Sequence, residues 1–424
     1  MGREQVSNEK ILNKKLLKNI NTVVFFDMVS KVLSFLLMIL LVRLLSKESF
    51  AAITLFISIS ALISNSISNG LNLSYVRYEV ERYSKTGSYT NLLIISLLIQ
   101  LMLIIIVVFL FYIYLCLPYS KNVLILEVFF FSVLYSIGLV LFSTISTFLQ
   151  IQEKYVLNGT LINIKNLTIF FICFIFSIYN NSINFDIVAI IYILAPAFSI
   201  PILYYIFKTT IFEKINKSDF KEFIRASIWL ILYSVFIAFL SQVDIIIINS
   251  MLSERDLANY GVSFRYYIIL LSILPSITTV LRIRTSKKDL INSAKKQKKM
   301  VIEWIRSTSK YVIPLITICI IISPTVLPLL NGDEYQLAII PFQILSIGAG
   351  ISYIFSPGIT IFMAMKKYRL LCGITLLALS INVIGNILII NHLNIIGVAI
   401  MTILAHAFLN ITIVLYVLMN LSKK

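Results

Sequence analysis

The chain has 424 residues, of which 59% are hydrophobic and 13% are charged, and its mean hydropathy is +0.94. Soluble domains contain roughly 25% charged residues, so this composition excludes a water-soluble globular protein. The net charge of +17 would suggest nucleic-acid binding in a soluble protein. In a membrane protein, however, basic residues also set the orientation of the helices, and nucleic acid is not an expected partner.

The chain begins with a polar, basic segment, 1–19, followed by an apolar run that we interpret as a retained helix and not a signal peptide. A helix needs about 20 apolar residues to cross the ~30 Å hydrocarbon core of a bilayer. Twelve runs meet this requirement: 20–42, 51–73, 92–115, 123–149, 156–178, 187–207, 224–250, 257–281, 309–330, 337–363, 370–390 and 395–419. The expected fold class is an all-α membrane protein with about 12 transmembrane helices.

The basic residues give these helices a direction. If the N-terminus is cytoplasmic, the outer turns contain only Arg43, Lys47, Lys121 and Arg255, whereas the inner segments hold most of the other Lys and Arg residues. This bias is typical of a correct topology, because cytoplasmic loops are enriched in Lys and Arg. Both termini are therefore predicted to be cytoplasmic.

Two pairs of similar segments indicate an internal duplication. LLSKESFAAITLF at 44–56 resembles the start of MLSERDLANYGVSFRYY at 251–267, with an offset of 207 residues. TFLQIQEKY at 147–155 resembles TIFMAMKKY at 360–368, with a similar offset of 213. Six helices per half is an even number, so both halves enter the membrane from the same side. The pattern predicts two parallel six-helix lobes related by a pseudo-twofold axis along the membrane normal, one of the arrangements of secondary transporters.

The duplication divides the chain into four parts. These are a cytoplasmic tail at 1–19, an N-lobe at 20–207, a cytoplasmic inter-lobe linker at 208–223 and a C-lobe at 224–424. The linker is polar and free of proline, as a mobile connection can be.

Charged residues within the predicted spans need a reason, because each costs about 2.5–3.5 kcal/mol at mid-membrane on insertion scales. Asp27 and Lys31 are four residues apart on one helix face, a spacing that favours an ion pair. Either they neutralise each other in such a pair, or Lys31 faces a hydrated cavity and attracts an anion. Asp244 and Arg265 have similar predicted depths and could form a packing salt bridge. Lys165 has no local acidic partner, which favours a hydrated interior that attracts anions.

The sequence also lacks the motifs that are typical of several other classes of protein. No loop is long enough for a soluble catalytic domain, and no GxxxxGK[ST] phosphate-binding loop is present, so the chain itself is not expected to hydrolyse ATP. The four cysteines are far apart and form no CxxC pair. Neither a disulfide framework, nor a metal site, nor a cofactor is therefore indicated.

Several segments carry a family resemblance. They are RLLSKESFAAITL at 43–55, Asp244 with the following LSERDLANYGVSFRY, LPLLNGDEYQLAIIPFQIL at 327–345, and ALSINVIGNILIINHLNIIGVAIMTI at 378–403. Together they resemble the polysaccharide flippases of the multidrug/oligosaccharidyl-lipid/polysaccharide exporter superfamily. The resemblance extends over essentially the whole chain, but its motifs are diffuse and indicate a family more than a substrate.

This resemblance implies a transporter, not an enzyme. Such flippases move an oligosaccharide on undecaprenyl diphosphate across the bacterial plasma (inner) membrane, for synthesis of O-antigen lipopolysaccharide, capsule or a related surface polysaccharide. Implied partners are this lipid-linked oligosaccharide, membrane lipids, a counter-ion (H⁺ or Na⁺), a polysaccharide polymerase and a chain-length regulator. Lys31, Lys165 and Arg265 are then candidate substrate-binding residues of a cationic cavity, with Asp27 and Asp244 as candidate coupling or ion-pair residues.

Three other functions remain open at this point. A drug or cation antiporter of the same superfamily would favour an acidic cavity, whereas the unpaired charge here is positive. A membrane glycan polymerase or acyltransferase would be expected to carry a long outer loop, which the chain lacks. A different small-solute secondary transporter is the third.

Overall fold

The computed structural model describes residues 2–115, 123–179, 183–272, 274 and 294–419. This part of the chain is almost entirely helical. The helices and strands are α1 (Gly2–Leu44), α2 (Lys47–Thr86), β1 (Tyr89–Thr90), α3 (Leu92–Leu115), α4 (Val123–Ile151), α5 (Tyr155–Tyr179), α6 (Phe185–Leu194), the 3-10 helix η1 (Ala195–Phe198), α7 (Ser199–Thr209), β2 (Phe212–Glu213), α8 (Lys217–Met251), α9 (Glu254–Leu271), α12 (Ala294–Asn331), the 3-10 helix η2 (Asp333–Ala338), α13 (Ile339–Phe355), α14 (Pro357–Ala364) and α15 (Tyr368–Met419).

The apolar runs form helices of membrane length. Ten helical segments in the described part of the chain are long and apolar enough to span a bilayer. The last of them, α15, contains the two predicted runs 370–390 and 395–419, which meet at a kink where Asn394 has a φ of 47°. The predicted run 257–281 begins as α9, and its second part lies outside the described residues. The expectation of an all-α membrane protein with about twelve spanning helices is therefore confirmed.

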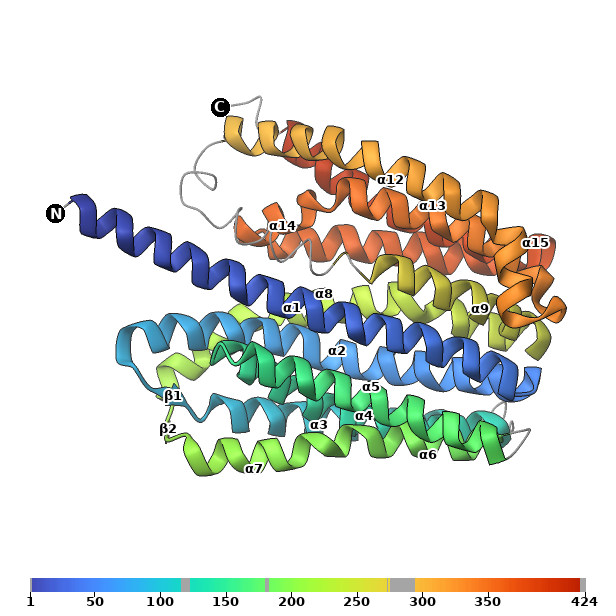
Figure 1. The fold of residues 1–424 in the computed structure, drawn as a ribbon, viewed down its shortest axis with the longest axis horizontal. Helices are drawn as coiled ribbons and strands as arrows, with labels where there is room; N and C mark the ends of the chain where they lie inside the picture. The colour runs from blue at the N-terminus through green and yellow to red at the C-terminus, as the bar shows by residue number, and fades with distance from the viewer. Residues whose placement is uncertain (1, 116–122, 180–182, 273, 275–293, 420–424) are drawn as a thin grey trace.

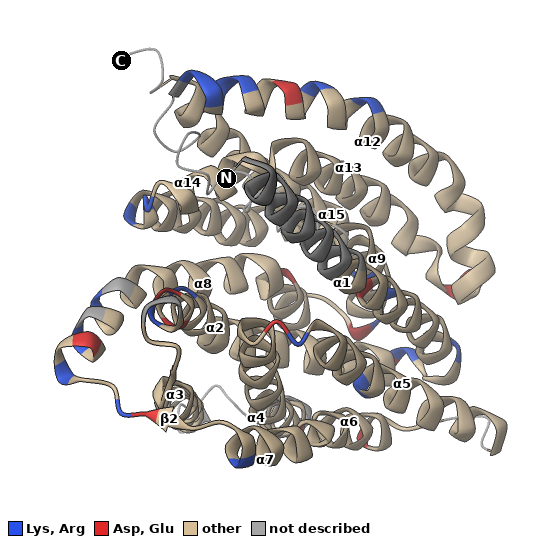
Figure 2. Ribbon diagram, turned by 60° about the vertical axis from the view of Figure 1, so that its left-hand side comes forward, with Lys and Arg blue, Asp and Glu red and all other residues tan. Residues whose placement is uncertain are grey.

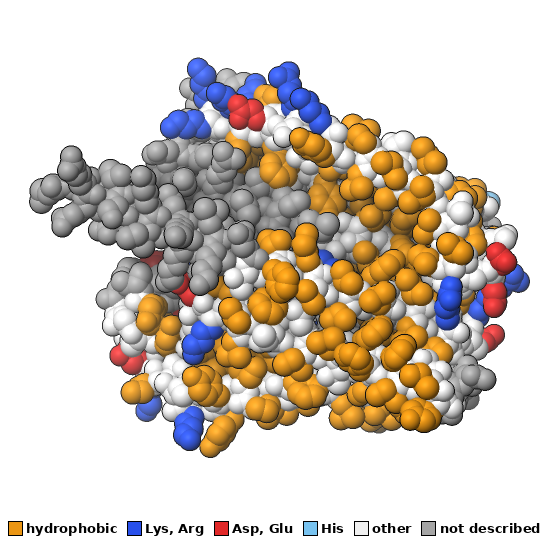
Figure 3. Space-filling view, viewed as in Figure 1, with side chains coloured by type: hydrophobic (Ala, Val, Ile, Leu, Met, Phe, Trp, Pro, Cys, Tyr) orange, Lys and Arg blue, Asp and Glu red, His pale blue; other side chains and the backbone are white. Residues whose placement is uncertain are grey.

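The helices run along the long axis of the molecule in two groups (Figure 1). α1 begins at the end of the bundle that also holds β1 and β2, which we call the strand end, and the turns after α1, α8 and α12 lie at the other end, the distal end. Charged residues gather mainly toward the two ends (Figure 2), and apolar side chains cover the middle of the face in Figure 3. This distribution suits a bundle whose middle contacts lipid.

The first pair of similar segments has the same structure in both lobes. Ser46 precedes α2 and Ser253 precedes α9, each with extended backbone and ψ values of 161° and 159°. The Ser46 side chain accepts a hydrogen bond from the Ser49 N–H, and the Ser253 side chain accepts one from the Asp256 N–H. Such N-caps stabilise a helix by about 1 kcal/mol. The repeated Leu-Ser pattern is thus a helix-starting signal at corresponding positions of the two lobes.

The second pair repeats a helix ending. Glu153 and Lys366 stand at the same position of the two similar segments, and both adopt a left-handed φ, 57° and 56°. Non-glycine residues rarely do so. The same backbone hydrogen bonds close both turns: Glu153 N–H to Gln150 O and Lys154 N–H to Leu149 O in one, and Lys366 N–H to Met363 O and Lys367 N–H to Phe362 O in the other. This helix-ending pattern, present twice, confirms the internal duplication.

The two lobes meet where α2 of the first lobe packs against α8 of the second. Gly70 allows this approach, because a Cβ atom at this position would lie 2.5 Å from the Ile231 Cα and 2.6 Å from the Ser234 Oγ. Helix backbones in membranes come this close only where small residues lie at the contact. The α2–α8 seam is therefore a close contact between the lobes in the described conformation.

Gly70→Ala is expected to lower the free energy of unfolding by about 1–3 kcal/mol, because the two helix backbones must separate to admit the methyl group. Gly373→Ala is the matched control, since no atom lies within 4 Å of a Cβ there. That change is expected to be neutral or to stabilise by up to about 1 kcal/mol. Thermal unfolding of the purified variants measures both, and equal stability of the two variants would contradict the packing argument.

Candidate functional site

Asp244 lies in α8 and is completely buried. Its carboxylate accepts hydrogen bonds from the Thr402 hydroxyl at 2.5 Å, the Asn386 amide at 2.9 Å and the Tyr260 hydroxyl at 3.1 Å. Thr402 and Asn386 belong to the two halves of α15, and Tyr260 belongs to α9. The carboxylate is thus a meeting point of three helices of the second lobe.

Asn382 extends this cluster by one helical turn. The Asn386 amide nitrogen also donates to the Asn382 Oδ1, at 3.1 Å. The Asn386 Oδ1 is buried and has no hydrogen-bond partner in the described part of the chain, and Asn382 also interacts with the Asp244 carboxylate. Buried polar atoms are normally paired, so this cluster holds spare hydrogen-bonding capacity next to a carboxylate.

This arrangement suits the binding of a small cation. A carboxylate in the membrane interior is costly unless its charge is neutralised, and the described hydrogen-bond partners of Asp244 are all neutral. Hard cations prefer carboxylate, amide and hydroxyl oxygens, and this cluster supplies all three types. A proton on the carboxyl group would neutralise it as well.

Arg265, which could have paired with Asp244 according to the sequence, lies elsewhere. It follows Tyr260 on α9, but its electrostatic neighbours are the hydroxyl groups of Tyr192 in α6 and Tyr135 in α4, both in the first lobe. Of the two possibilities that the sequence left open, the Asp244–Arg265 salt bridge is not found in the described part of the chain. The reason is that similar depth in the membrane does not place two side chains on facing sides of their helices.

The surroundings of Arg265 form an aromatic wall of the first lobe. The rings of Tyr135 and Tyr192 are 5.6 Å apart, and Phe56 stacks on Tyr135 at 5.5 Å. The Arg265 Nη2 is buried and has no hydrogen-bond partner in the described part of the chain. The Arg265 guanidinium thus extends from the second lobe to the first, and its Nη2 can still donate hydrogen bonds to a ligand.

Lys165 and Lys31 lie on adjoining helices of the first lobe. Neighbouring residues join α5 to α1, because the Asn166 amide donates to the Ser30 hydroxyl at 2.6 Å. The Lys165 ammonium lies 4.7 Å from the centre of the Phe142 ring, and no described acidic side chain forms an ion pair with it. Asp27 lies one helical turn before Lys31 on α1, and the carboxylate and the ammonium attract each other electrostatically. The structure thus brings Lys31 and Lys165 to the same level of one helix pair, with Asp27 beside the first.

At the distal end, polar contacts hold the two lobes together. The Arg43 Nε and Nη2 donate to the Leu330 and Leu329 carbonyl oxygens, both at 2.8 Å. The Lys47 Nζ lies 3.1 Å from the Glu334 Oε2. These contacts join the turn between α1 and α2 to the turn between α12 and α13.

Aromatic packing supports these polar contacts. Tyr335 packs edge-on against Phe50 at 6.1 Å, and the Lys47 ammonium lies 5.8 Å from the centre of the Tyr335 ring. We call this set the distal latch, and it comprises Arg43, Lys47, Phe50, Leu329, Leu330, Glu334 and Tyr335. The latch was not predicted from the sequence, although Arg43 and Lys47 are two of the few basic residues in the predicted outer turns.

Arg43→Ala is expected to let the lobes separate at the distal end more often, because it removes two hydrogen bonds between them. Exposed charged contacts contribute about 0.2–1 kcal/mol, so the open fraction is expected to rise about 1.4- to 5-fold. Spin labels at Glu48 in α2 and Asp333 in η2 report the separation as a distance distribution. Arg255→Ala, an exposed arginine outside the latch, is the control, and an unchanged distribution in Arg43→Ala would contradict the role of the latch.

The sequence matches a known protein family, and the fold is similar to solved structures of membrane transporters. A family model described as "Polysaccharide biosynthesis protein" matches residues 16–282. The solved structure of the lipid II flippase MurJ in an inward closed conformation is similar, with 16% identity, a TM-score of 0.68, and coverage of 94% of this chain and 88% of that one. No curated protein sequence matches at a significant level.

Multidrug transporters share the fold as well. A mutant of the Vibrio cholerae MATE transporter VcmN has 14% identity and a TM-score of 0.67, with coverage of 96% of this chain and 98% of that one. An inward-facing MATE transporter of the MOP superfamily has 15% identity and a TM-score of 0.69, with coverage of 95% and 98%. The chain therefore has the two-lobe fold of these flippases and transporters. Because the family model covers more than half of it, the protein belongs to the polysaccharide biosynthesis protein family.

Proposed function

We propose that the protein is a flippase that translocates an oligosaccharide linked to undecaprenyl diphosphate across the bacterial plasma membrane. The observation that carries this proposal is the set of cations Lys31, Lys165 and Arg265 within the spans of a member of this family. A diphosphate and its sugars cannot cross hydrocarbon alone, because unsolvated charge and unpaired hydroxyl groups are too costly there. Fixed cations between the lobes replace water around the phosphates, while the prenyl chain stays in lipid.

The lobes move the substrate by alternating access. In the described conformation the distal latch holds the lobes together at the distal end, so substrate enters from the strand end. Opening of the latch then exposes it to the opposite leaflet. The concentration of basic residues in the segments of the strand end supports a cytoplasmic location for this end and for both termini. The product is a repeat unit for O-antigen, capsule or a related surface polysaccharide, which a polymerase and a chain-length regulator then use.

Asp244 is the coupling residue in this proposal. Its carboxylate joins α8, α9 and both halves of α15, so neutralisation of its charge by Na⁺ or H⁺ changes the packing of four spans together. A ligand shifts a conformational equilibrium only through its different affinity for the two states. A cation that binds this cluster more tightly in one state therefore drives the change of access.

Proteoliposomes that contain the purified protein test the proposal. A fluorescent trisaccharide on undecaprenyl diphosphate is placed in one leaflet, and a membrane-impermeant glycosidase reports its arrival in the other. Translocation above that of protein-free liposomes is expected. Efflux of a lipophilic cation such as ethidium without movement of the lipid would favour the drug or cation antiporter and contradict the flippase. Glycan polymerisation in the same vesicles would indicate an enzyme instead.

A further inference from the structure

The linker between the lobes is anchored to the first lobe. Strand β2 of the linker pairs in parallel with β1, which follows α2, so that Tyr89 faces Phe212 and Thr90 faces Glu213. The Asn91 N–H donates to the Glu213 carbonyl at 2.8 Å. The Ile215 N–H donates to the Asn91 Oδ1 at 3.0 Å. The linker segment up to Ile215 therefore belongs to the first lobe.

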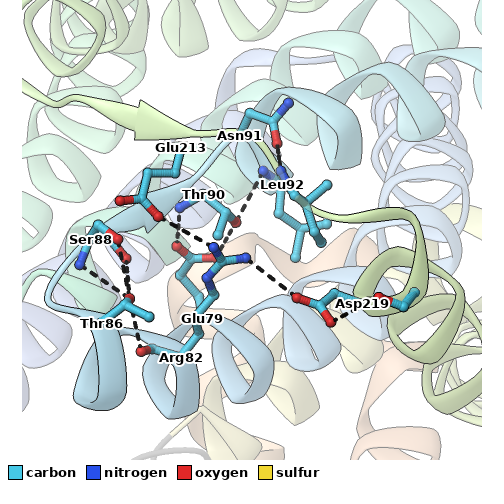
Figure 4. Close-up of polar contacts among 11 residues, drawn as sticks. Glu79, Arg82, Thr86, Ser88, Thr90, Asn91, Leu92, Glu213 and Asp219 are labelled. Carbon is cyan, nitrogen blue, oxygen red and sulfur yellow. Dashed lines mark hydrogen bonds and ion pairs between the residues drawn. The ribbon is translucent and has the colours of Figure 1, made fainter.

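Strand β1 is itself held firmly. Glu79 of α2 is completely buried, and it accepts hydrogen bonds from the Thr90 N–H at 2.5 Å and from the Thr90 hydroxyl at 2.7 Å (Figure 4). The Tyr89 ring stacks on Tyr83 of α2 at 4.4 Å, and burial raises the pKa of Tyr89 to about 12, which keeps its hydroxyl neutral. The anchor thus consists of α2, β1 and β2.

Arg82 reaches from this anchor to α8, which begins within the predicted linker 208–223 and continues into the second lobe. Its Nη2 lies 3.3 Å from the Glu213 Oε2 within the anchor, and its Nη1 lies 3.7 Å from the Asp219 Oδ2 in the first turn of α8 (Figure 4). The Arg82 side chain is mostly buried, with 16% of its surface exposed, and Asp219 is 38% exposed. Water therefore screens the Arg82–Asp219 contact only partly. It is a contact between the lobes on the strand end of the α2–α8 seam.

We propose that the junction at Asn216, between the anchor and α8, is the hinge of the lobe movement and that the Arg82–Asp219 ion pair is a lock favouring the conformation with a closed distal latch. The reason is geometric. The anchor moves with the first lobe, α8 begins at Lys217, and so the backbone between them must absorb the relative rotation. Glu213 and Arg82 keep their contact during this rotation, whereas Arg82 and Asp219 separate. This lock does not depend on the identity of the substrate.

Asp219→Asn tests the lock through the accessibility of a distant residue. Thr54 of α2 is 1% exposed and packs against Gly261 of α9 across the lobe interface. In a protein with its native cysteines replaced, Thr54→Cys reports distal opening by its rate of reaction with a membrane-impermeant thiol reagent. Asp219→Asn is expected to raise this rate about 1.4- to 5-fold, the range for loss of a partly exposed ion pair.

Two variants of the same helix turn are the controls. Asp219→Glu keeps the charge and is expected to restore the slow labelling rate. Lys221→Gln removes an exposed charge of the same helix and is expected to leave the rate unchanged. An equal rate in Asp219→Asn and its parent would overturn the lock. Because this readout needs no substrate, its failure is distinguishable from failure of the proposed function.

A disulfide tests the anchor separately. Tyr89 and Phe212 are direct partners in the strand pair, so Tyr89→Cys with Phe212→Cys has a suitable geometry for a cross-link. Because the anchor remains closed throughout the movement, oxidation is expected to leave hydrogen–deuterium exchange of α2 around Thr54 unchanged. A fall in exchange on oxidation, reversed by a reductant, would show that the strands must part and would overturn the hinge assignment.

Discussion

Asp244→Asn is expected to lower the translocation rate at least about 10-fold, within the range of coupling free energies of 1–3 kcal/mol. Asparagine has nearly the same shape as aspartate and can still accept hydrogen bonds from the Thr402 and Tyr260 hydroxyl groups. It cannot carry the negative charge that attracts a cation. The variant therefore remains folded and loses its response to the ion. Translocation in proteoliposomes with and without a Na⁺ or H⁺ gradient measures this effect.

The same variant identifies the ion. If Na⁺ binds, NaCl is expected to raise the melting temperature of the unaltered protein relative to choline chloride, because a ligand that binds only the folded state stabilises it by about 2.7 kcal/mol at 100 times its Kd. Asp244→Asn is expected to lose this shift. Glu254→Gln, which removes an exposed acid at the start of α9, is the control and is expected to keep it. Translocation by Asp244→Asn at the unaltered rate would contradict a coupling role.

The lobes and their duplication could be predicted because they rest on local signals. Apolar runs of membrane length indicate helices wherever they occur. The two repeated turns are defined by residues within one or two turns of each other, as the Ser46 and Ser253 caps show. Even the unusual backbone of Glu153 and Lys366 is part of a short repeated pattern.

The site could be predicted only in part, because it depends on which side of its helix each residue faces. Counting residues from the α8–α9 turn predicts only depth along the helix, and Asp244 is buried inside the protein. On α9, however, Arg265 follows Tyr260 by five residues, a rotation of about 140°. Since Tyr260 faces Asp244, Arg265 faces away from it.

The neutral polar residues of the site were also difficult to predict from the sequence. Asn382, Asn386 and Thr402 complete the Asp244 cluster, and none of them is charged. The signal in the sequence was the spacing of the two asparagines, four apart within the apolar run at 370–390. The pairing of β1 with β2 left even less trace, because two residues per strand carry no periodic pattern.

Arg265→Ala is expected to lower translocation roughly 10- to 150-fold, because hydrogen bonds to charged groups contribute about 1.5–3 kcal/mol. The guanidinium offers a planar set of donors that matches phosphate oxygens in pairs, and its Nη2 has no described partner within the protein. Arg265→Lys keeps the charge without the paired donors, so we expect an intermediate rate. Transport of the fluorescent lipid-linked trisaccharide in proteoliposomes measures all three proteins.

A purely structural role of Arg265 predicts a different result. If the guanidinium served only to hold Tyr135 and Tyr192 in place, Arg265→Ala would lower the melting temperature, and added substrate would stabilise the variant as much as the unaltered protein. A substrate-binding role predicts the opposite, a loss of this stabilisation by substrate. Arg255→Ala, on the exposed first turn of the same helix, is expected to behave as the unaltered protein. Unaltered transport by the Ala variants of Arg265, Lys165 and Lys31 alike would contradict a cationic pathway, since no fixed charge would then accompany the diphosphate across the membrane.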